Sequence, residues 1–267
     1  MNSVQEVPFR VSARTARLIG RENVATAESA ISELVKNSYD ADASFCIVRI
    51  SPAYDHVPAQ LPKREYDLLT DWGLAPENHY DLNDDFATLR PCLGDKHSPE
   101  AKLIQNFVTV TVTDDGSGMG DDAIRDAWMV IGTANKEQDS SSKMGRTRTG
   151  AKGIGRFALD RLGAKCQLHS SSTDENDRTE TLTWTVDWSK FEKDGAVLDE
   201  VTATIELGAP GFSNAIESIR KVPSLESFAK SAEDKRSGTS IHISEVRDHW
   251  SPERLCCTNP IMRGFTT

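Results

Sequence analysis

A helical pattern in residues 26–42, TAESAISELVKNSYDAD, constrains the fold of this chain more than any other stretch. Ala27, Ile31, Leu34 and Val35 follow one another at the spacing i, i+4, i+7 and i+8. This spacing is the apolar stripe of a helix that packs on a hydrophobic core. The stretch therefore predicts an amphipathic helix with one buried face and one polar face.

The polar face of this helix carries an unusual set of side chains. Thr26 is suited to cap the helix, and Glu28 places a carboxylate in its first turn. Glu33 and Asn37 are four residues apart and share a face, with Asp40 one turn further along. An acid, an amide and a second acid in this order form either a solvated surface or part of a binding site.

A second signal follows a clear strand pattern. Residues 107–113, FVTVTVT, alternate apolar residues with threonine, and Asp114, Gly116, Gly118 and Met119 come directly after them. A carboxylate at a strand end can accept a hydrogen bond from an exocyclic amine such as N6 of adenine. The glycines allow the backbone to approach a flat ring, and the methionine can pack on its face. The same residues also suit a plain glycine-rich turn.

A third signal is the glycine-rich stretch 150–155, GAKGIG, which opens a predicted helix over 156–162. Backbone N–H groups at a helix N-terminus favour a phosphate chain. The stretch lacks the Gly-Lys-Ser/Thr ending of a Walker A loop and the preceding strand of a dinucleotide fingerprint. Residues 143–165 carry seven basic residues against one acidic residue, which favours a polyanionic ligand, although a plain turn in a solvated loop is the alternative.

Composition limits the class of protein. The 267 residues carry a net charge of −10, which argues against a general nucleic-acid or anionic-membrane binder. The five cysteines show no metal-binding spacing and predict reduced thiols in a cytoplasmic protein. No apolar run approaches the ~20 residues of a membrane span. The six histidines are scattered and are interpreted as ordinary surface or core residues.

The order of the remaining elements predicts an α+β fold. Helices come early and are followed by a run of strands, so we expect a two-layer sandwich with helices on one face of a mixed, mostly antiparallel sheet. We expect one domain over 1–250, an inserted segment at about 51–105 that is rich in proline, and the start of a linker or a following domain at 251–267. Further strands are predicted at 45–50, 165–170, 180–187, 200–207 and 238–244, and a further helix at 213–221.

Taken together and in this order, these motifs resemble the GHKL ATPases, a superfamily of gyrase B-type topoisomerases, heat-shock chaperones, histidine kinases and MutL proteins. Residues 33–41 resemble its N box, and 114–119 its adenine-binding box. Gly132 and Thr133, the polar loop after them and 150–155 resemble its lid, and Gly238-Thr239 resembles its last nucleotide-side motif. The amino-acid sequence of the lid is most similar to that of bacterial chaperone-like and MORC-like members. The resemblance implies the Bergerat ATP-binding fold.

The resemblance also implies roles for individual residues. Glu33 would be the general base for the attacking water, and Asn37 would bind Mg²⁺ through its amide oxygen. Asp114 would bind the adenine amine directly, and Thr239 would do so through water. The remaining nucleotide-binding positions implied are Asp40, Ala41, Gly116, Gly118, Met119, Thr133, Gly150, Lys152, Gly153, Ile154 and Gly155.

The implied function is Mg²⁺-dependent ATP binding and slow hydrolysis, with ATP and ADP as ligands. Lid closure and a nucleotide-dependent homodimer would follow, in the N-terminal module of a longer protein. A nucleotide sensor or scaffold without useful hydrolysis is one alternative. An ATP-gated DNA clamp that uses Arg146 and Arg148 is another, and the overall charge argues against it.

Overall fold

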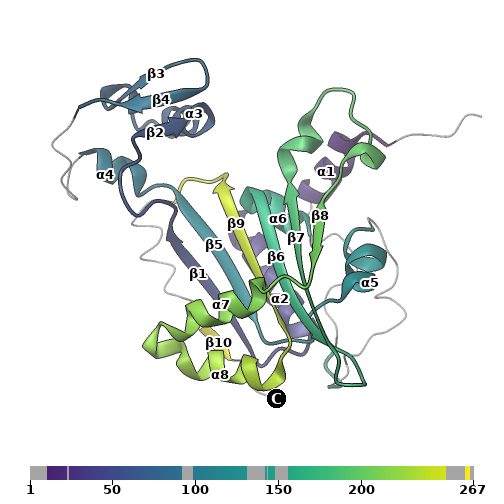
Figure 1. Cartoon of the computed structure of the whole chain (residues 1–267). Helices are drawn as coiled ribbons and strands as arrows, with labels where there is room; N and C mark the ends of the chain where they lie inside the picture. The colour runs from purple at the N-terminus through teal and green to yellow at the C-terminus, as the bar shows by residue number, and fades with distance from the viewer. Residues whose placement is uncertain are drawn as a thin grey trace, which may run out of the picture.

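A computed structural model describes residues 11–22, 24–91, 99–130, 142, 144–147, 156–250 and 262–264. These residues form a large sheet with helices on both sides and a smaller structural unit at one end (Figure 1). The helices are α1 (Ala13–Glu22), α2 (Ala27–Asp40), α3 (Lys63–Asp71), α4 (Pro99–Ile104), α5 (Asp121–Ala123, continued by a π-helical turn to Trp128), α6 (Phe157–Leu162), α7 (Gly211–Arg220) and α8 (Glu226–Lys235). Within the described ranges, no helix has both the length and the apolarity needed to cross a lipid bilayer.

The large sheet is antiparallel at each of its strand pairings and has the order β10-β1-β5-β9-β6-β7-β8. Its strands are β1 (Phe45–Pro52), β5 (Val108–Asp114), β6 (Gly163–Thr173), β7 (Thr179–Asp187), β8 (Thr204–Leu207), β9 (Gly238–Val246) and β10 (Met262–Gly264). The predicted α+β sandwich with a mostly antiparallel sheet is confirmed. The stretch 251–267, expected to begin a linker or a following domain, contributes the edge strand β10.

Side-chain alternation divides the sheet into two faces. Val110 and Val112 of β5 pack in the main core with Leu34 of α2 and Leu159 of α6. The opposite face carries a second, smaller core in which Phe45 and Ile47 of β1 pack against the hairpin of α7 and α8. Figure 1 shows α2 and α6 behind the sheet and α7 in front of it. The prediction of helices on one face therefore describes the main layer, and α7 with α8 adds a partial layer on the other face.

The α2 helix forms as its pattern predicts. Thr26 caps it, because its Oγ1 accepts a hydrogen bond of 3.1 Å from the Ser29 backbone N–H. Ala27, Ala30 and Leu34 are buried, which fixes the helix against the sheet. Burial of one leucine contributes about 1.5–3 kcal/mol. The face that carries Glu33 and Asn37 is thereby set at the edge of the main core.

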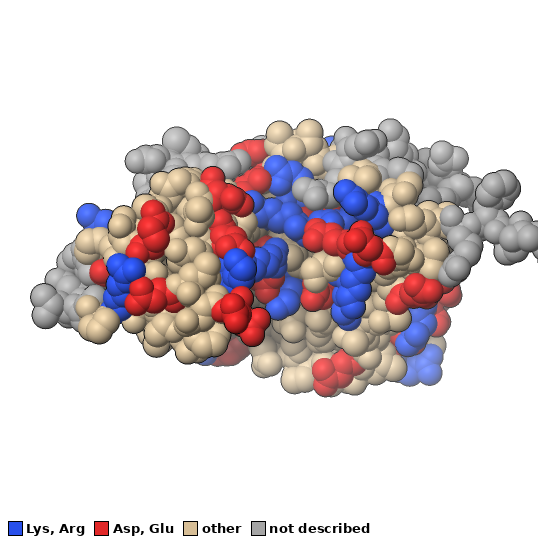
Figure 2. Space-filling model, turned by 90° about the horizontal axis from the view of Figure 1, so that it is seen from above, with Lys and Arg blue, Asp and Glu red and all other residues tan. Residues whose placement is uncertain are grey.

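The inserted segment is a folded unit and not a loop. Its short strands β2 (Gln60–Pro62), β3 (Tyr80–Leu82) and β4 (Phe86–Leu89) form a separate three-stranded sheet. Leu61, Leu69 and Tyr80 are buried in a core of their own. Proline density suggests a loop, but the apolar residues between the prolines suffice for a small core. Seen from the end that carries this unit, acidic and basic side chains are interspersed across the surface (Figure 2).

The insert lies at the end of the sheet away from the Asp114 turn. The chain leaves β1 at Pro52 and returns at Val108, and these residues are paired across β1 and β5. Asp114 pairs with Cys46 at the other end of the same ladder. The two ends are six residue steps apart along β5, which corresponds to roughly 20 Å. The insert is therefore remote from every motif that resembles a nucleotide site at that end of β5.

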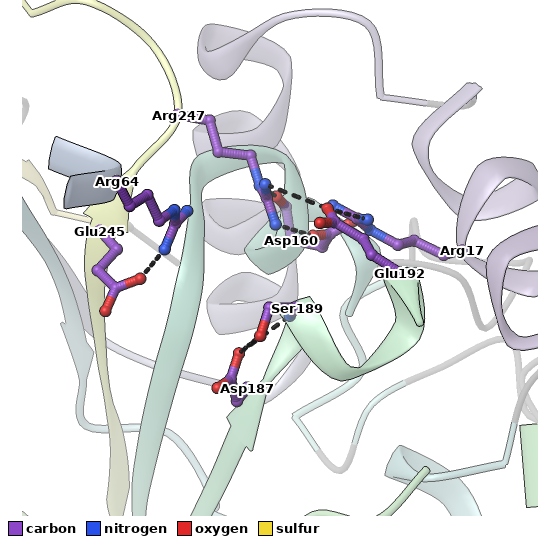
Figure 3. A network of polar contacts seen from close by, with 8 residues as sticks. All are labelled: Arg17, Arg64, Asp160, Asp187, Ser189, Glu192, Glu245 and Arg247. Atoms are coloured by element: carbon purple, nitrogen blue, oxygen red, sulfur yellow. Dashed lines mark hydrogen bonds and ion pairs between the residues drawn. The ribbon is translucent and has the colours of Figure 1, made fainter. Parts of the chain in front are cut away.

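A buried ion network holds α6, the helix that follows the glycine-rich stretch 150–155 (Figure 3). The Asp160 carboxylate is fully buried, and it accepts hydrogen bonds from Arg17 Nε at 2.6 Å and from an Arg247 terminal nitrogen at 2.7 Å. Glu192 also pairs with Arg17, at 2.5 Å. Two cations around one buried carboxylate satisfy its charge and join α1 and the end of β9 to α6.

Replacing residues 53–107 by a two-residue turn should leave the large sheet folded. The paired positions Pro52 and Val108 are close enough for a tight hairpin connection. Loss of the Arg64–Glu245 ion pair and of the Trp72–His249 stack should reduce the free energy of unfolding by only about 1–2 kcal/mol. Circular dichroism and urea denaturation provide the measurement. If the deletion variant does not unfold cooperatively, the claim that the large sheet folds without the insert is wrong.

Candidate functional site

The end of β5 meets the C-terminal part of α2 at Asp114. Asp114 Oδ2 accepts a hydrogen bond of 2.9 Å from Ser38 Oγ, and Oδ1 accepts one of 3.0 Å from the Gly116 backbone N–H. The residue is buried, yet a carboxylate has about four lone-pair positions, of which these bonds use two. Asp114 is thus an oriented acceptor between helix and sheet.

Polar side chains from three neighbouring strands form a row on the α2 side of the sheet. Asp114 is paired with Thr239 of β9, and Thr239 is paired with Ser170 of β6. The Ser170 hydroxyl accepts a hydrogen bond of 2.7 Å from the Met119 backbone N–H, which brings the end of the glycine-rich turn over this row. Asp114, Thr239 and the turn that ends at Met119 therefore lie next to one another.

The two glycines of the turn are required by close contacts. A Cβ on Gly116 would lie 2.8 Å from the Ala41 carbonyl oxygen and 2.9 Å from the Ala41 Cβ. Gly118 has φ +66°, and a Cβ there would collide with the Ser171 carbonyl. The Ser117 backbone N–H also donates to the Ala41 carbonyl at 2.9 Å. The turn is thereby fixed to the last residues of the helical motif.

Glu33, Asn37 and Ala41 are successive i, i+4 positions along α2. Because Ala41 contacts the glycine turn, Asn37 lies one helical turn from it and Glu33 two turns from it. Asn37 is partly exposed, and Glu33 Oε1 accepts a hydrogen bond of 2.6 Å from Lys36 Nζ. Asp40 is buried and takes no part in this line.

Asp115, next to Asp114, has a structural role that sequence reasoning does not identify. Its side chain is fully buried, and Oδ1 accepts hydrogen bonds from the backbone N–H groups of Ser44 at 2.7 Å and Phe45 at 3.0 Å. Lys235 of α8 forms an ion pair with it at 2.8 Å. Asp115 thus joins the start of β1, the end of β5 and α8. A doubled Asp at the strand end is the only sequence signal for this role.

The pKa values of the two neighbouring carboxylic acids are shifted in opposite directions. Burial raises the pKa of Asp114 to about 6, although the bonds from Gly116 and Ser38 oppose this. Burial also acts to raise the pKa of Asp115, but its bonds to Lys235, Ser44 and Phe45 outweigh burial and lower it. Asp114 is therefore the acid that a hydrogen-bond donor in a ligand would stabilise in its ionised form.

Part of the predicted lid docks on the end of α2. Asp42, at φ +61°, accepts hydrogen bonds from Ser142 Oγ at 2.5 Å and from the Met144 backbone N–H at 3.2 Å. Arg146 donates to the Ala43 carbonyl at 2.8 Å, and its guanidinium lies 4.9 Å from the centre of the Tyr39 ring. The DNA-clamp alternative would use Arg146 to bind DNA, whereas in the structure its side chain makes these contacts within the protein.

Other predicted site residues cannot be placed. Thr133, Gly150 and residues 152–155, Lys-Gly-Ile-Gly, lie outside the described residues, as does Arg148. Arg156, which follows the glycine-rich stretch, is buried, and this burial lowers the pKa of its guanidinium to about 10.

The variants Asp115→Asn and Asp114→Asn should differ in their effect on the free energy of unfolding. Asp115→Asn removes a buried acceptor with an ion pair, and the free energy of unfolding should fall by about 2–4 kcal/mol. Asp114→Asn removes a charge that burial disfavours, so it should cost less than 1 kcal/mol at neutral pH or stabilise the fold. Urea denaturation measures both variants. Equal losses would mean that both acids are structural.

The pH dependence of the free energy of unfolding should also reveal the raised pKa of Asp114. Because its pKa is raised to about 6 from 3.8, the folded state holds a proton between these values that the unfolded state releases. The wild type should therefore lose stability relative to Asp114→Asn as the pH rises from about 4 to about 6. Asp115, with its lowered pKa, contributes stability above the ordinary pKa of an aspartate and loses it as the pH falls through its lowered value. A stability difference between wild type and Asp114→Asn that is independent of pH would contradict the raised pKa.

Comparison with known proteins gives one family. A family model described as histidine kinase-, DNA gyrase B- and HSP90-like ATPase matches residues 99–221. The match includes β5, the Asp114 turn and the glycine-rich stretch, and α2 lies before it. No curated protein matches the chain. The matched segment and the antiparallel α+β fold make this part of the chain similar to the ATPase domains of that family.

Proposed function

We propose that this chain binds ATP with Mg²⁺ between α2 and the ends of β5 and β9, and hydrolyses it slowly. The family match supports ATP binding. The observation that carries the proposal is the buried Asp114 carboxylate, oriented by Ser38 and Gly116 and still able to accept from a ligand. A charge-assisted hydrogen bond of this kind contributes about 1.5–3 kcal/mol.

The adenine would lie over the row formed by Asp114, Thr239 and the turn that ends at Met119. Asp114 would accept a hydrogen bond from the exocyclic amine, and Thr239 would act through a water molecule. The close packing of Gly116 on Ala41 supports this placement, because the turn leaves no volume for larger side chains there.

The phosphates would lie along the polar line of α2. Mg²⁺ prefers oxygen ligands, and the partly exposed Asn37 amide fits this ion together with the phosphate oxygens. The ion would neutralise charge on the phosphates. Glu33, one turn before Asn37, would orient the attacking water and accept its proton, for which it must leave its contact with Lys36.

The lid would close over bound nucleotide, and dimerisation would follow. The contacts of Asp42 with Ser142 and Met144 support a lid that is anchored beside the site at this point. Chaperone-like or MORC-like membership and a cytoplasmic location are part of this proposal. A DNA clamp is less well supported, because Arg146 contacts Ala43 and Tyr39, and the net charge is −10.

Calorimetric titration with a non-hydrolysable ATP analogue tests the binding proposal. We expect micromolar affinity that depends on Mg²⁺ and is reduced about tenfold or more in Asp114→Asn, because the variant loses a charge-assisted acceptor. Thermal denaturation of the variant checks its folding. Wild-type affinity in a folded Asp114→Asn variant would remove the role assigned to Asp114.

Substitution of Glu33 separates an ATPase from a nucleotide sensor. Glu33→Gln should keep nucleotide affinity and reduce turnover by about 10²–10⁴-fold, because the general base is removed. The matched control is Lys36→Gln, which removes the ion-pair partner and keeps the carboxylate. Steady-state phosphate release measures both variants. If Glu33→Gln turns over like the wild type, the sensor alternative takes precedence.

A further inference from the structure

The face of the sheet opposite the Asp114 site contains a separate cavity. It lies between α7 and strands β1, β5, β9 and β6, with a volume of about 330 Å³. Thr109, Thr111 and Thr113 of β5 line it, whereas the alternating Val110 and Val112 face α2. The thickness of the sheet therefore separates this cavity from the nucleotide site.

The cavity is polar on its sheet side, which is unusual beneath a packed helix. His169 and His242 lie on the adjacent strands β6 and β9, with His169 paired to Ser240, two residues before His242. The His169 Nδ1 is 2.9 Å from Thr183 Oγ1, and the His242 Nδ1 is 3.4 Å from Thr111 Oγ1. In the part of the chain that the structure describes, neither Nε2 atom has a hydrogen-bond partner.

The charge of the cavity favours an anion. Arg49 of β1 is the one formally charged side chain among its described lining residues, and none of them is acidic. Arg49 Nε donates to Ser51 Oγ at 3.3 Å, and its terminal N–H groups can form a bidentate contact with a carboxylate or phosphate. Burial lowers the pKa of both imidazoles, and the negative charge of a bound anion would raise it by favouring the protonated form.

The helix side of the cavity supplies apolar surface. Ile219 and Ala215 of α7, with Ile47 of β1, line it beside the polar sheet face. Small-molecule sites in proteins occupy about 300–1,000 Å³ and combine apolar walls with a few convergent polar groups. The volume of this cavity corresponds to the lower end of that range, so it fits a compact molecule.

We propose that the cavity bounded by Arg49, His169, His242 and α7 is a second ligand site, which takes a small organic anion with a carboxylate or phosphate group and a compact apolar part. Arg49 binds the anionic group, the imidazoles contribute hydrogen bonds, and the apolar part packs on Ile47 and Ile219. The site is independent of ATP and does not rest on the function proposed above.

Histidine side-chain NMR tests this site with two probes, benzoate and phenyl phosphate. We expect saturable shifts of the ring signals of His169 and His242, assigned with the His169→Gln and His242→Gln variants, while His56 and His79 of the insert do not shift. The relative affinity of the two probes identifies the preferred anionic group. Binding should strengthen as the pH falls, because Arg49, His169 and His242 are the charged and titratable groups among the described lining residues.

Three variants make the test specific. Arg49→Gln should weaken binding about tenfold or more. Ala215→Phe should abolish binding by filling the cavity. The matched control Arg178→Gln removes an equally charged, exposed side chain from the β6–β7 turn and should bind like the wild type. Thermal denaturation checks the folding of each variant.

Three outcomes would overturn the proposal. The first is the lack of any saturable shift at His169 and His242 with either probe. The second is an equal loss of affinity in Arg49→Gln and Arg178→Gln, which would indicate general electrostatic attraction. The third is displacement of the probe by the ATP analogue, which would place the probe in the nucleotide site.

Discussion

The hydrogen bond from Ser38 to Asp114 connects the two halves of the candidate site. Ser38 lies on the buried side of α2, and Asp114 ends strand β5. Through this bond the position of the helix fixes the orientation of the carboxylate. Because Ala41, three residues later, contacts the glycine turn, the helix and the turn are held together at two points. A rigid acceptor of this kind favours binding, because little conformational entropy is lost at this side chain when a ligand binds.

The adjacent acids Asp114 and Asp115, at the end of β5, have different roles because their surroundings differ. Asp115 is saturated by Ser44, Phe45 and Lys235, and it stabilises the junction of β1, β5 and α8. Asp114 is buried with fewer donors, and its pKa is raised to about 6. The stability that Asp115 supplies allows its neighbour to keep an unfavourable buried charge. Functional sites commonly combine a stable frame with a group whose ionisation is shifted in this way.

Local patterns predict the elements of this fold, and long-range contacts decide what they do. The apolar spacing of 26–42 and the alternation of 107–113 correspond to α2 and β5, because helix and strand periodicities are local properties. The convergence of Asp114, Thr239 and Met119 follows from the resemblance and is consistent with the strand pairing. The structural role of Asp115 depends on Lys235, 120 residues away, and no local pattern indicates it.

The positions of histidines and prolines in the sequence indicate little about their surroundings in the fold. His169 and His242 are scattered in the sequence, yet the antiparallel pairing of β6 and β9 brings them to the same cavity. The proline-rich stretch 51–105 suggests a loop, yet its spaced apolar residues form a separate core. For the histidines the deciding factor is strand pairing between distant segments, which sequence spacing does not encode.

The central claim is that Asp114 recognises an exocyclic amine on the base. The most direct test is the affinity of the wild type for a non-hydrolysable ATP analogue, compared with the same analogue whose purine lacks the 6-amino group. We predict about tenfold or greater preference for the amine in the wild type, and no preference in Asp114→Asn. Equal wild-type affinity for the two analogues would contradict the account, because the oriented carboxylate would then have no partner on the base.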